Sequence, residues 1–331
     1  MTLPKFDYVA PRSVQEACQL LEGGGGGARA IAGGTELLMA LKNRQESPGV
    51  LVDLAALPLD KISYSDEDGL RIGALVTLRH LAAHPLVGAK YPVLAQAARA
   101  AGTVQLQAMA TIGGNLCQNT CCMYYHRAAG ARQSLDPCLK LDGDLCYVVA
   151  GSAQCWASYA GDLAPALLVL GATIVIADSH GEKIMPLRDL FSGDGKRPHT
   201  LGPGQLVTEI RVPSAASRSG GAYVKLRQRA ALDYPLLGVA AYVAMDAAGT
   251  TCREAALALT GVERTPVIVE EACRLQGEAL TDGAIQTLAA AARRRARAIN
   301  NVCGIPVRYR RDMVAVYAES ALRRARDAAT H

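Results

Sequence analysis

The chain has 331 residues, half of them apolar, and carries 35 Lys and Arg residues against 30 Asp and Glu residues. This length suffices for two domains, and a net charge of +5 gives no electrostatic argument for a nucleic-acid or membrane partner. Pro4, Lys5 and Asp7 interrupt the N-terminal segment, and no apolar run is long enough to span a membrane. We therefore expect a cytoplasmic protein, in which thiols stay reduced.

Short strands and helices alternate in the first half of the chain. Ser13 and Glu16 form a capping box that predicts a helix to about Leu21, which the glycine run at 23–27 ends. The pattern then predicts, in order, a strand at 30–32, a helix at 36–42, strands at 50–54 and 70–74, and helices at 77–83 and 92–101. A buried helix at 163–170, a strand at 173–177 and a loop at 193–204 follow a cysteine-rich stretch.

A change of composition near Ser214 predicts a domain boundary. The segment PSAASRSGG, at 213–221, has the small residues of a linker, and a new strand is expected from Tyr223. Further strands are predicted at 239–245 and 255–260, and helices from about Val267 and at 282–298. We therefore predict two domains, at 1–217 and 218–331.

Two glycine turns suggest a binding site for a diphosphate. They are AGGTELL at 32–38, where a strand, a tight turn and a helix follow one another, and TIGGNLC at 111–117. Glycine removes the Cβ atom where a backbone could approach a ligand, and such turns point N–H groups at an anion. Two turns that converge would serve the two charged groups of a diphosphate. If only these two short segments are considered, the alternative is that they are two structural turns that bind no ligand together.

The chain resembles the flavin subunits of molybdenum hydroxylases, the xanthine dehydrogenase and carbon monoxide dehydrogenase group. IAGGTELL at 31–38, ATIGGNLC at 110–117 and GDLAPALLVLGATIVI at 161–176 look like the successive FAD-contacting segments of that family. YVKLRQRAALDYPLLGVAAYV at 223–243 looks like the start of its C-terminal domain. The resemblance implies an α+β fold, with a two-subdomain FAD-binding domain of the PCMH or vanillyl-alcohol-oxidase-like type. A smaller α+β domain of the CO dehydrogenase flavoprotein type would follow.

The resemblance also implies which residues bind FAD. One side of the diphosphate would be wrapped by Ala32, Gly33, Gly34, Thr35 and Glu36, and the other by Thr111, Gly113, Gly114 and Asn115. Asp162 would accept hydrogen bonds from the FAD sugar hydroxyls. Lys225 would lie near the flavin ring, with a surface lysine on a strand as the equally weighted alternative. Many relatives carry an Arg-Asn pair before the second turn, where this chain has Gln107 and Ala108, so a contact from that arginine is in doubt.

Six of the ten cysteines lie within residues 117–155. From Cys122 the spacing is Cys-x15-Cys-x7-Cys-x8-Cys, through Cys138, Cys146 and Cys155. Four thiolates are the usual complement of a [4Fe-4S] cluster and also of structural zinc. The spacing does not choose between them, although the lack of a Cys-x2-Cys knuckle favours iron.

An insertion of this kind, at about 118–158, resembles the β subunits of 4-hydroxybenzoyl-CoA reductases, which add a [4Fe-4S] cluster to the flavin subunit. The resemblance selects Cys122, Cys138, Cys146 and Cys155 as ligands. It leaves Cys121 as a bystander, and Cys117 is expected to pack near the flavin. The four scattered cysteines are predicted to be small buried apolar residues; they are Cys18, Cys252, Cys273 and Cys303.

The same resemblance implies an electron-transfer subunit in a complex, as a dimer of heterotrimers. Its partners would be a large molybdopterin-binding subunit, a small subunit with two [2Fe-2S] clusters and a ferredoxin-like donor. Electrons would run through [4Fe-4S] and FAD toward molybdenum, where 4-hydroxybenzoyl-CoA is reduced to benzoyl-CoA. One alternative is a hydroxylase or dehydrogenase subunit that passes electrons outward to NAD or a quinone. The other is a zinc-stabilised binding module without a redox role.

Overall fold

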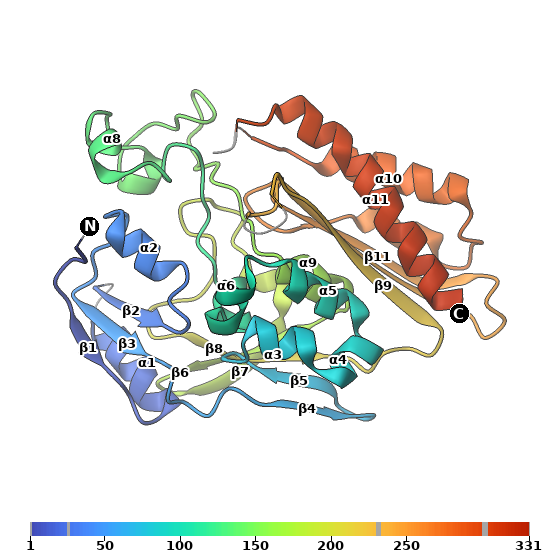
Figure 1. Cartoon of the computed structure of the whole chain (residues 1–331), viewed down its shortest axis with the longest axis horizontal. Coiled ribbons are helices and arrows are strands. Elements are labelled where there is room, and N and C mark those ends of the chain that lie inside the picture. The colour runs from blue at the N-terminus through green and yellow to red at the C-terminus, as the bar shows by residue number, and fades with distance from the viewer. Residues whose placement is uncertain (1, 25–26, 230–232, 300–303, 331) are drawn as a thin grey trace.

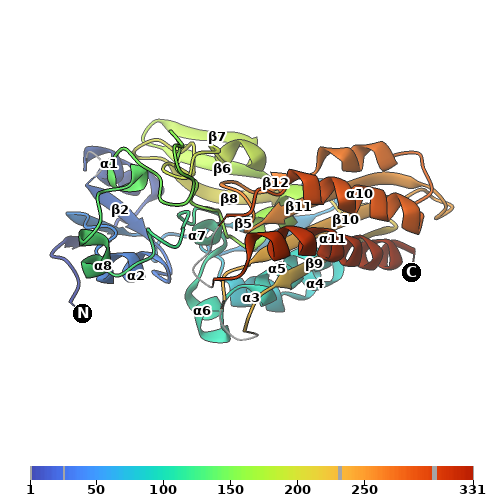
Figure 2. The same cartoon turned by 90° about the horizontal axis from the view of Figure 1, so that it is seen from above.

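The computed structural model of the protein describes residues 2–24, 27–229, 233–299 and 304–330. Its strands form three sheets with helices beside them, so the predicted α+β class is confirmed (Figure 1). Seen from above, the N-terminal sheet lies at one end of the molecule and the two C-terminal helices lie toward the other (Figure 2). Within the described ranges, no helix combines the length and apolar character that a membrane crossing requires.

The first sheet has three parallel strands in the order β1-β3-β2. They are β1 (Asp7–Val9), β2 (Ala28–Ile31) and β3 (Val50–Asp53), with α1 (Val14–Gly23) packed against them and α2 (Leu37–Lys42) after β2. Ser13 Oγ accepts a hydrogen bond from the N–H of Glu16, as the capping box predicts. Gly24 caps the end of α1, and Gly25 and Gly26 of the glycine run lie outside the described residues.

The second sheet has five antiparallel strands in the order β4-β5-β8-β6-β7. They are β4 (Ile62–Ser65), β5 (Gly69–Gly73), β6 (Thr173–Asp178), β7 (Gly181–Pro186) and β8 (Leu206–Val212). Between β5 and β6 the chain forms α3 (Leu78–Ala83), α4 (Pro85–Lys90), α5 (Pro92–Ala100), α6 (Val104–Met109), α7 (Ile112–Leu116) and α9 (Leu163–Val169). The predicted start of the helix at 77–83 is confirmed, since Thr77 Oγ1 accepts from the N–H of His80.

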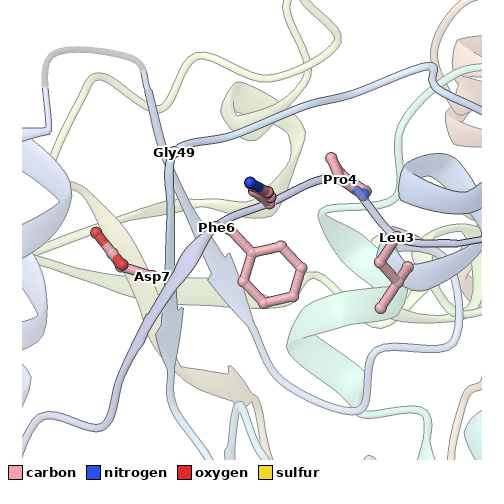
Figure 3. Close-up of a pocket in the computed structure, with 6 residues that line it drawn as sticks. Leu3, Pro4, Phe6, Asp7 and Gly49 are labelled. Carbon is pink, nitrogen blue, oxygen red and sulfur yellow. The ribbon is translucent and has the colours of Figure 1, made fainter.

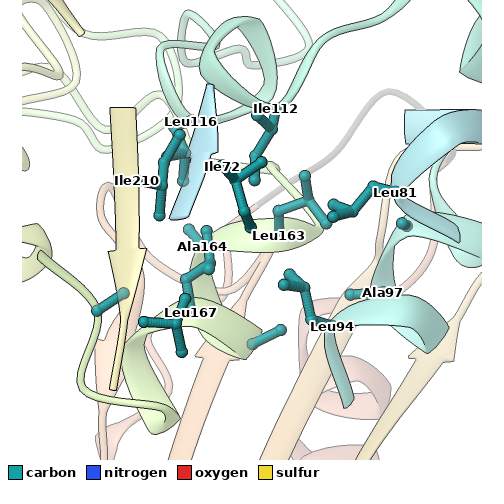
Figure 4. Close-up of a cluster of buried hydrophobic side chains, with 14 of the residues drawn as sticks. Ile72, Leu81, Leu94, Ala97, Ile112, Leu116, Leu163, Ala164, Leu167 and Ile210 are labelled. Carbon is teal, nitrogen blue, oxygen red and sulfur yellow. The ribbon is translucent and has the colours of Figure 1, made fainter. Parts of the chain in front are cut away.

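The helix α9 lies at the centre of the main hydrophobic core (Figure 4). Leu163, Ala164 and Leu167 on this helix are fully buried, together with Ile72 on β5 and Leu94 on α5. A helix that is apolar on nearly all sides is stable only when other elements surround it. Pro165 stands in the first turn, where a missing N–H costs no helical hydrogen bond, so it does not interrupt the helix.

The C-terminal sheet has four antiparallel strands in the order β12-β11-β10-β9. They are β9 (Ser219–Leu226), β10 (Leu237–Met245), β11 (Cys252–Thr260) and β12 (Val267–Ile268), followed by α10 (Asp282–Arg295) and α11 (Val307–Thr330). The helix α11 covers one face of this sheet, and α5 and α9 pack on the other (Figure 1). Every residue of β10 is buried, because its side chains alternate between two cores: Ala240 and Tyr242 belong to the main core, and Val239 and Ala241 to the C-terminal one.

Two expectations for the C-terminal part are wrong. The last residues of the expected linker, from Ser219 to Gly221, belong to β9 and pair with β10. A Cβ atom at Gly220 would lie 2.2 Å from the carbonyl oxygen of Ala325 on α11. Glycine there allows the helix to approach the strand closely. The helix expected from Val267 is instead the short strand β12 and a 3-10 helix at Glu270–Leu275.

The cysteine-rich insertion leaves the first domain after α7 and returns before α9. At its neck the N–H of Cys121 donates to the carbonyl of Ser158 over 3.0 Å, and the N–H of Ser158 donates back over 2.8 Å. Its regular elements are α8 (Ala129–Gln133) and a 3-10 turn at Leu139–Leu141. The helix α8 lies beside α2 in both views (Figures 1 and 2), and Arg132 Nη2 donates to the carbonyl of Asn43 over 2.7 Å. The insertion therefore rests on the end of the helix that follows the first glycine turn.

Candidate cofactor site

The first glycine turn joins β2 to α2. Gly34 has a φ of 66°, a conformation that favours glycine, and its carbonyl accepts a hydrogen bond from the N–H of Leu38. Gly33 is required for a different reason, since a Cβ atom built on it would lie 1.8 Å from the carbonyl oxygen of Met109. Met109 ends α6, directly before the second glycine turn. The two turns predicted from the sequence are thus in backbone contact.

The second glycine turn is the start of α7. Thr111 caps this helix, and its Oγ1 accepts a hydrogen bond from the N–H of Gly114 over 3.1 Å. The N–H of Gly113 donates to the carbonyl of Ala74 over 2.9 Å, and a Cβ atom at Gly113 would meet that alanine within 3 Å. Asn115 Oδ1 accepts from the N–H of Leu163 over 3.0 Å. This turn is therefore tied to the start of α9, where Asp162 is located.

Asp162 and Lys225 form a buried ion pair. Lys225 Nζ lies 3.0 Å from Asp162 Oδ2, and the two side chains are 3% and 6% exposed, respectively. The Tyr223 hydroxyl donates to Asp162 Oδ1 over 2.7 Å, and Lys225 Nζ also donates to the carbonyl of Ala100. The alternative of a surface lysine is therefore wrong. Burial raises the pKa of Asp162, and the opposing effects of Lys225 and Tyr223 do not cancel this rise.

These contacts link the residues that the sequence predicts for FAD into one continuous series. Gly33 contacts the segment that enters the second turn, Asn115 of that turn binds the start of α9, and Asp162 beside it binds Lys225 on β9. Ala32, Thr35 and Glu36 lie on the first turn. The site thus spans the first domain and reaches the C-terminal domain through Lys225.

The four predicted cluster ligands line one small cavity in the insertion; they are Cys122, Cys138, Cys146 and Cys155. Neither Cys117 nor Cys121 is among its lining residues. Two of the sulfur atoms accept backbone hydrogen bonds: Cys122 Sγ from Tyr125 at 3.3 Å, and Cys155 Sγ from Ala157 at 3.5 Å. Hydrogen bonds of this kind stabilise thiolates that bind iron.

A tight turn brings Cys138 close to the segment of Cys146. The N–H of Gly143 donates to the carbonyl of Cys138 over 3.0 Å, and a Cβ atom at Gly143 would lie 1.7 Å from the carbonyl oxygen of Pro137. Asp142, the residue before it, has a φ of 63°. The sequence interpretation did not use this glycine, although a Gly between two closely spaced cysteines is the signal that such a turn leaves.

The side chains around this cavity can be compared with what a metal ion and a cluster each require. Within the described ranges, no three His, Cys, Asp or Glu side chains converge as ligands of one ion. In a cubane cluster each thiolate binds its own iron, so four sulfur atoms surround the cluster and need not meet at one point. Burial raises the pKa of the Cys155 thiol to about 11, while the Ala157 N–H and the Lys140 ammonium oppose the rise. Bound iron would supply the missing charge compensation.

Lys140 and Asn119 connect the cavity to the first glycine turn. Lys140 lines the cavity, and its Nζ donates to Asn119 Oδ1 over 2.8 Å. The N–H of Asn119 donates to Glu36 Oε1 over 3.1 Å. Burial raises the pKa of Glu36 to about 8, because the opposing effects of Asn119 and Lys140 are smaller. Glu36 therefore points toward the insertion, a placement that the sequence motif does not show.

The C-terminal domain closes the other side of the cavity. The Arg264 guanidinium stacks 4.5 Å from the centre of the Trp156 ring, and Trp156 lines the cavity. Ile299 packs with Cys122, Cys155 and other residues of the insertion in a small separate core. Both domains thus contribute to the shell around the four cysteines.

Of the scattered cysteines that the structure describes, none lines this cavity. Cys18 and Cys252 are buried as predicted, whereas Cys273 is exposed and the prediction for it is wrong. Cys273 stands on the 3-10 helix whose buried side is formed by Ala272 and Leu275. Cys303 lies outside the described residues.

A further hollow lies near the start of the chain, against β1 (Figure 3). Its lining contains neither a cysteine nor a residue of the glycine turns; it is formed by Leu3, Pro4, Lys5, Phe6, Asp7 and Gly49. It is separate from the site described above.

Comparison with known proteins agrees with this geometry. Residues 4–215 match the FAD binding domain in molybdopterin dehydrogenase, and residues 222–325 match the CO dehydrogenase flavoprotein C-terminal domain. The chain is therefore a flavoprotein with both domains of that type. It belongs to the FAD-binding medium subunits of the molybdenum hydroxylase family.

Relatives of this family are similar along most of the chain. The aldehyde oxidoreductase FAD-binding subunit PaoB of Escherichia coli (strain K12) is 36% identical over 263 residues, covering 74% of this chain and 78% of the relative. The carbon monoxide dehydrogenase medium chain of Afipia carboxidovorans is 30% identical over 97% of this chain and 96% of its own length. The structure resembles carbon monoxide dehydrogenase from Hydrogenophaga pseudoflava, with a TM-score of 0.82, 28% identity and 99% of each chain covered.

Proposed function

We propose that this chain is the FAD-binding and [4Fe-4S]-binding electron-transfer subunit of a molybdenum-containing complex. The observation that carries the proposal is the single cavity lined by Cys122, Cys138, Cys146 and Cys155, within an insertion between two of the FAD segments. Its partners would be a large molybdopterin-binding subunit and a small subunit with two [2Fe-2S] clusters. Substrate conversion would take place on the large subunit.

The glycine turns and the buried ion pair would hold FAD. The missing Cβ atoms at Gly33 and Gly113 let neighbouring parts of the protein approach these turns closely, and the diphosphate would lie against the turns built in this way. Lys225 would set a positive charge near the flavin ring, where it favours the reduced, anionic flavin. Asp162 fixes the ammonium of Lys225, and its remaining lone pairs would accept from the sugar hydroxyls. When bound, FAD supplies reversible electron uptake between the cluster and the rest of the complex.

For the substrate, we propose the reductive removal of the phenolic hydroxyl of 4-hydroxybenzoyl-CoA. The support is the insertion itself, which resembles that of the β subunits of such reductases at the quoted cysteine segments. A cluster beside the flavin would receive electrons from a low-potential donor such as ferredoxin and pass them through FAD toward molybdenum.

A second candidate is the outward transfer of electrons from an oxidised substrate such as an aldehyde. The observation in its favour is the 36% identity to a subunit named for an aldehyde oxidoreductase. In this case the same cysteine cavity would pass electrons from FAD to an external acceptor. The two candidates share the cofactors and differ in the direction of electron flow.

The protein purified without oxygen tests the shared part of the proposal. We expect about four irons and about four acid-labile sulfides per FAD, and a paramagnetic resonance signal after reduction. A colourless protein with bound zinc, or a flavoprotein without iron, would contradict it.

With the whole complex, benzoyl-CoA formed from 4-hydroxybenzoyl-CoA and reduced ferredoxin supports the first candidate. Aldehyde-dependent reduction of an acceptor, without dehydroxylation, supports the second.

A further inference from the structure

Lys140 is a cation held at the edge of the cysteine cavity. It lines the cavity, and it lies in the sequence two residues after Cys138. Its Nζ atom donates to three oxygen atoms: Asn119 Oδ1 at 2.8 Å, Thr120 Oγ1 at 2.6 Å and the carbonyl of Gly195 at 2.6 Å. The ring of Tyr125 lies on a further side, with its centre 5.1 Å from Nζ. The ammonium group is therefore fixed in position.

The hydrogen-bond pattern matches the charged form of this side chain. The carbonyl of Gly195 and the amide oxygen of Asn119 can only accept. The hydroxyl of Thr120 uses its one proton to donate to the carbonyl of Gly195 over 2.5 Å, so toward Lys140 it can only accept. Three acceptors need three N–H donors, which an ammonium has and a neutral amine lacks.

The three oxygens that hold Lys140 belong to uncharged groups. The nearest carboxylate on this path is Glu36, which reaches Lys140 only through Asn119. None of the three acceptors of Nζ is a carboxylate, so its positive charge acts on the cavity without direct compensation from these groups. In a partly buried site, where the effective dielectric constant is far below that of water, such a charge acts strongly on its neighbours.

We propose that Lys140 is a positioning residue that raises the reduction potential of the iron–sulfur centre by fixing a positive charge beside it. This inference rests on the proposed [4Fe-4S] centre. Reduction adds one electron to a cluster whose thiolates already make it negative, so a nearby cation stabilises the reduced form more than the oxidised one. The same contacts tie that cation through Asn119 to Glu36, on the turn proposed to bind FAD.

The test is a redox titration of the full chain, purified without oxygen together with any subunits that accompany it. The variants are Lys140→Gln, which removes the charge, and Lys140→Arg, which keeps it. The matched control is Lys196→Gln, because Lys196 also lies beside the insertion, is 36% exposed and pairs with the exposed Asp142. Iron, sulfide and FAD are measured for each protein before the potential is determined from the paramagnetic resonance signal.

We expect the Lys140→Gln protein to retain iron and FAD. Its reduction potential should be lower by at least about 59 mV, which corresponds to a tenfold change in the equilibrium constant of a one-electron reduction. Lys140→Arg should shift the reduction potential less. Lys196→Gln should leave the potential unchanged, because solvent screens the charge of Lys196. A normal cluster with an unchanged potential in Lys140→Gln would overturn the inference. Iron-free wild-type protein would instead overturn the proposed function.

If the Lys140→Gln protein lacks the cluster, the titration is carried out on Lys140→Met instead. This variant keeps an unbranched side chain and removes the charge. Loss of the cluster in both neutral variants, with an intact Lys140→Arg protein, would also overturn the inference. The charge would then be needed to assemble the centre and would not act by setting its potential.

Discussion

The carboxylate of Asp162 and the ammonium of Lys225, 3.0 Å apart and almost completely buried, join the start of α9 to β9 of the C-terminal domain. Removing one member of a buried pair leaves the other charge without compensation, which costs about 3–5 kcal/mol. We expect Asp162→Asn and Lys225→Met each to lower the free energy of unfolding in urea by about this amount. The double variant should be more stable than the sum of the two single effects implies.

The exposed pair of Arg71 and Asp68 provides the control. Asp68→Asn should change the free energy of unfolding by no more than about 1 kcal/mol, as is usual for surface pairs. Equal, small effects at Asp162 and Asp68 would show that the buried pair does not hold the two domains together.

Gly33→Ala should disrupt the contact between the two glycine turns. The added methyl group would lie 1.8 Å from the carbonyl oxygen of Met109, so the backbone has to move. We expect a loss of stability of about 1–3 kcal/mol and a much lower FAD content after gel filtration. Gly88→Ala is the control, since a Cβ atom there meets nothing within 4 Å and Gly88 lies inside α4. This control should gain about 0.5–1 kcal/mol and keep its FAD. Full FAD content in Gly33→Ala would argue against a diphosphate site at these turns.

Cys138→Ser should abolish the proposed iron–sulfur centre and leave FAD bound, because the glycine turns lie outside the insertion. Cys121→Ser should keep both cofactors, since Cys121 does not line the cavity. The exposed Cys273→Ser provides the control for cysteine replacement in general. The iron, sulfide and FAD contents of the purified proteins show which variants have lost a cofactor. Simultaneous loss of FAD and iron in Cys138→Ser would show that the two sites are not independent.

His199 should make the protein less stable in mild acid. Burial lowers the pKa of His199 to about 4, and the hydrogen bond between Nε2 and the carbonyl of Leu116 only partly opposes this. In the unfolded chain the imidazole takes up its proton near pH 6.5, so the unfolded state binds more protons between pH 6.5 and 4. The free energy of unfolding should therefore fall as the pH is lowered through this window. The contribution of His199 should be roughly 1–3 kcal/mol.

Urea unfolding at pH 7 and pH 5 measures this effect. The difference between the two pH values should shrink in His199→Gln and should persist in His180→Gln, which replaces an exposed histidine. A difference that is the same in all three proteins would assign the pH dependence to other groups.

The sequence predicts the elements that carry the candidate site where its signals are local. Ser13, Thr77 and the two glycine turns act on residues within one helical turn of themselves, and α1, α3 and α2 appear where these residues predict them. The four cysteines that the resemblance selects likewise line one cavity. What could not be predicted depends on distant neighbours. The partner of Asp162, Lys225, lies 63 residues away on β9, and no pattern around either residue specifies that pair.

One strand that the sequence does not predict, β7, lacks a periodic apolar pattern. In β7, Glu182 and Lys183 are both exposed, and β7 stands at the edge of its sheet, where few side chains need to be buried. Small residues such as Ser219 and Gly220 predict a linker, whereas the lack of a side chain at Gly220 is what allows α11 to pack closely on β9. In both cases tertiary contacts, and not local preference, determine the strand.

The paired backbone hydrogen bonds between Cys121 and Ser158 close the insertion into a loop at its base. The entropic cost of closing such a loop grows only with the logarithm of its length, by about 0.6 kcal/mol for each doubling. A flavin domain that already contains this closure can lengthen the loop considerably at little thermodynamic cost. The insertion is then free to vary in sequence. The hydrogen bonds at its base keep the residues of the insertion beside the first glycine turn.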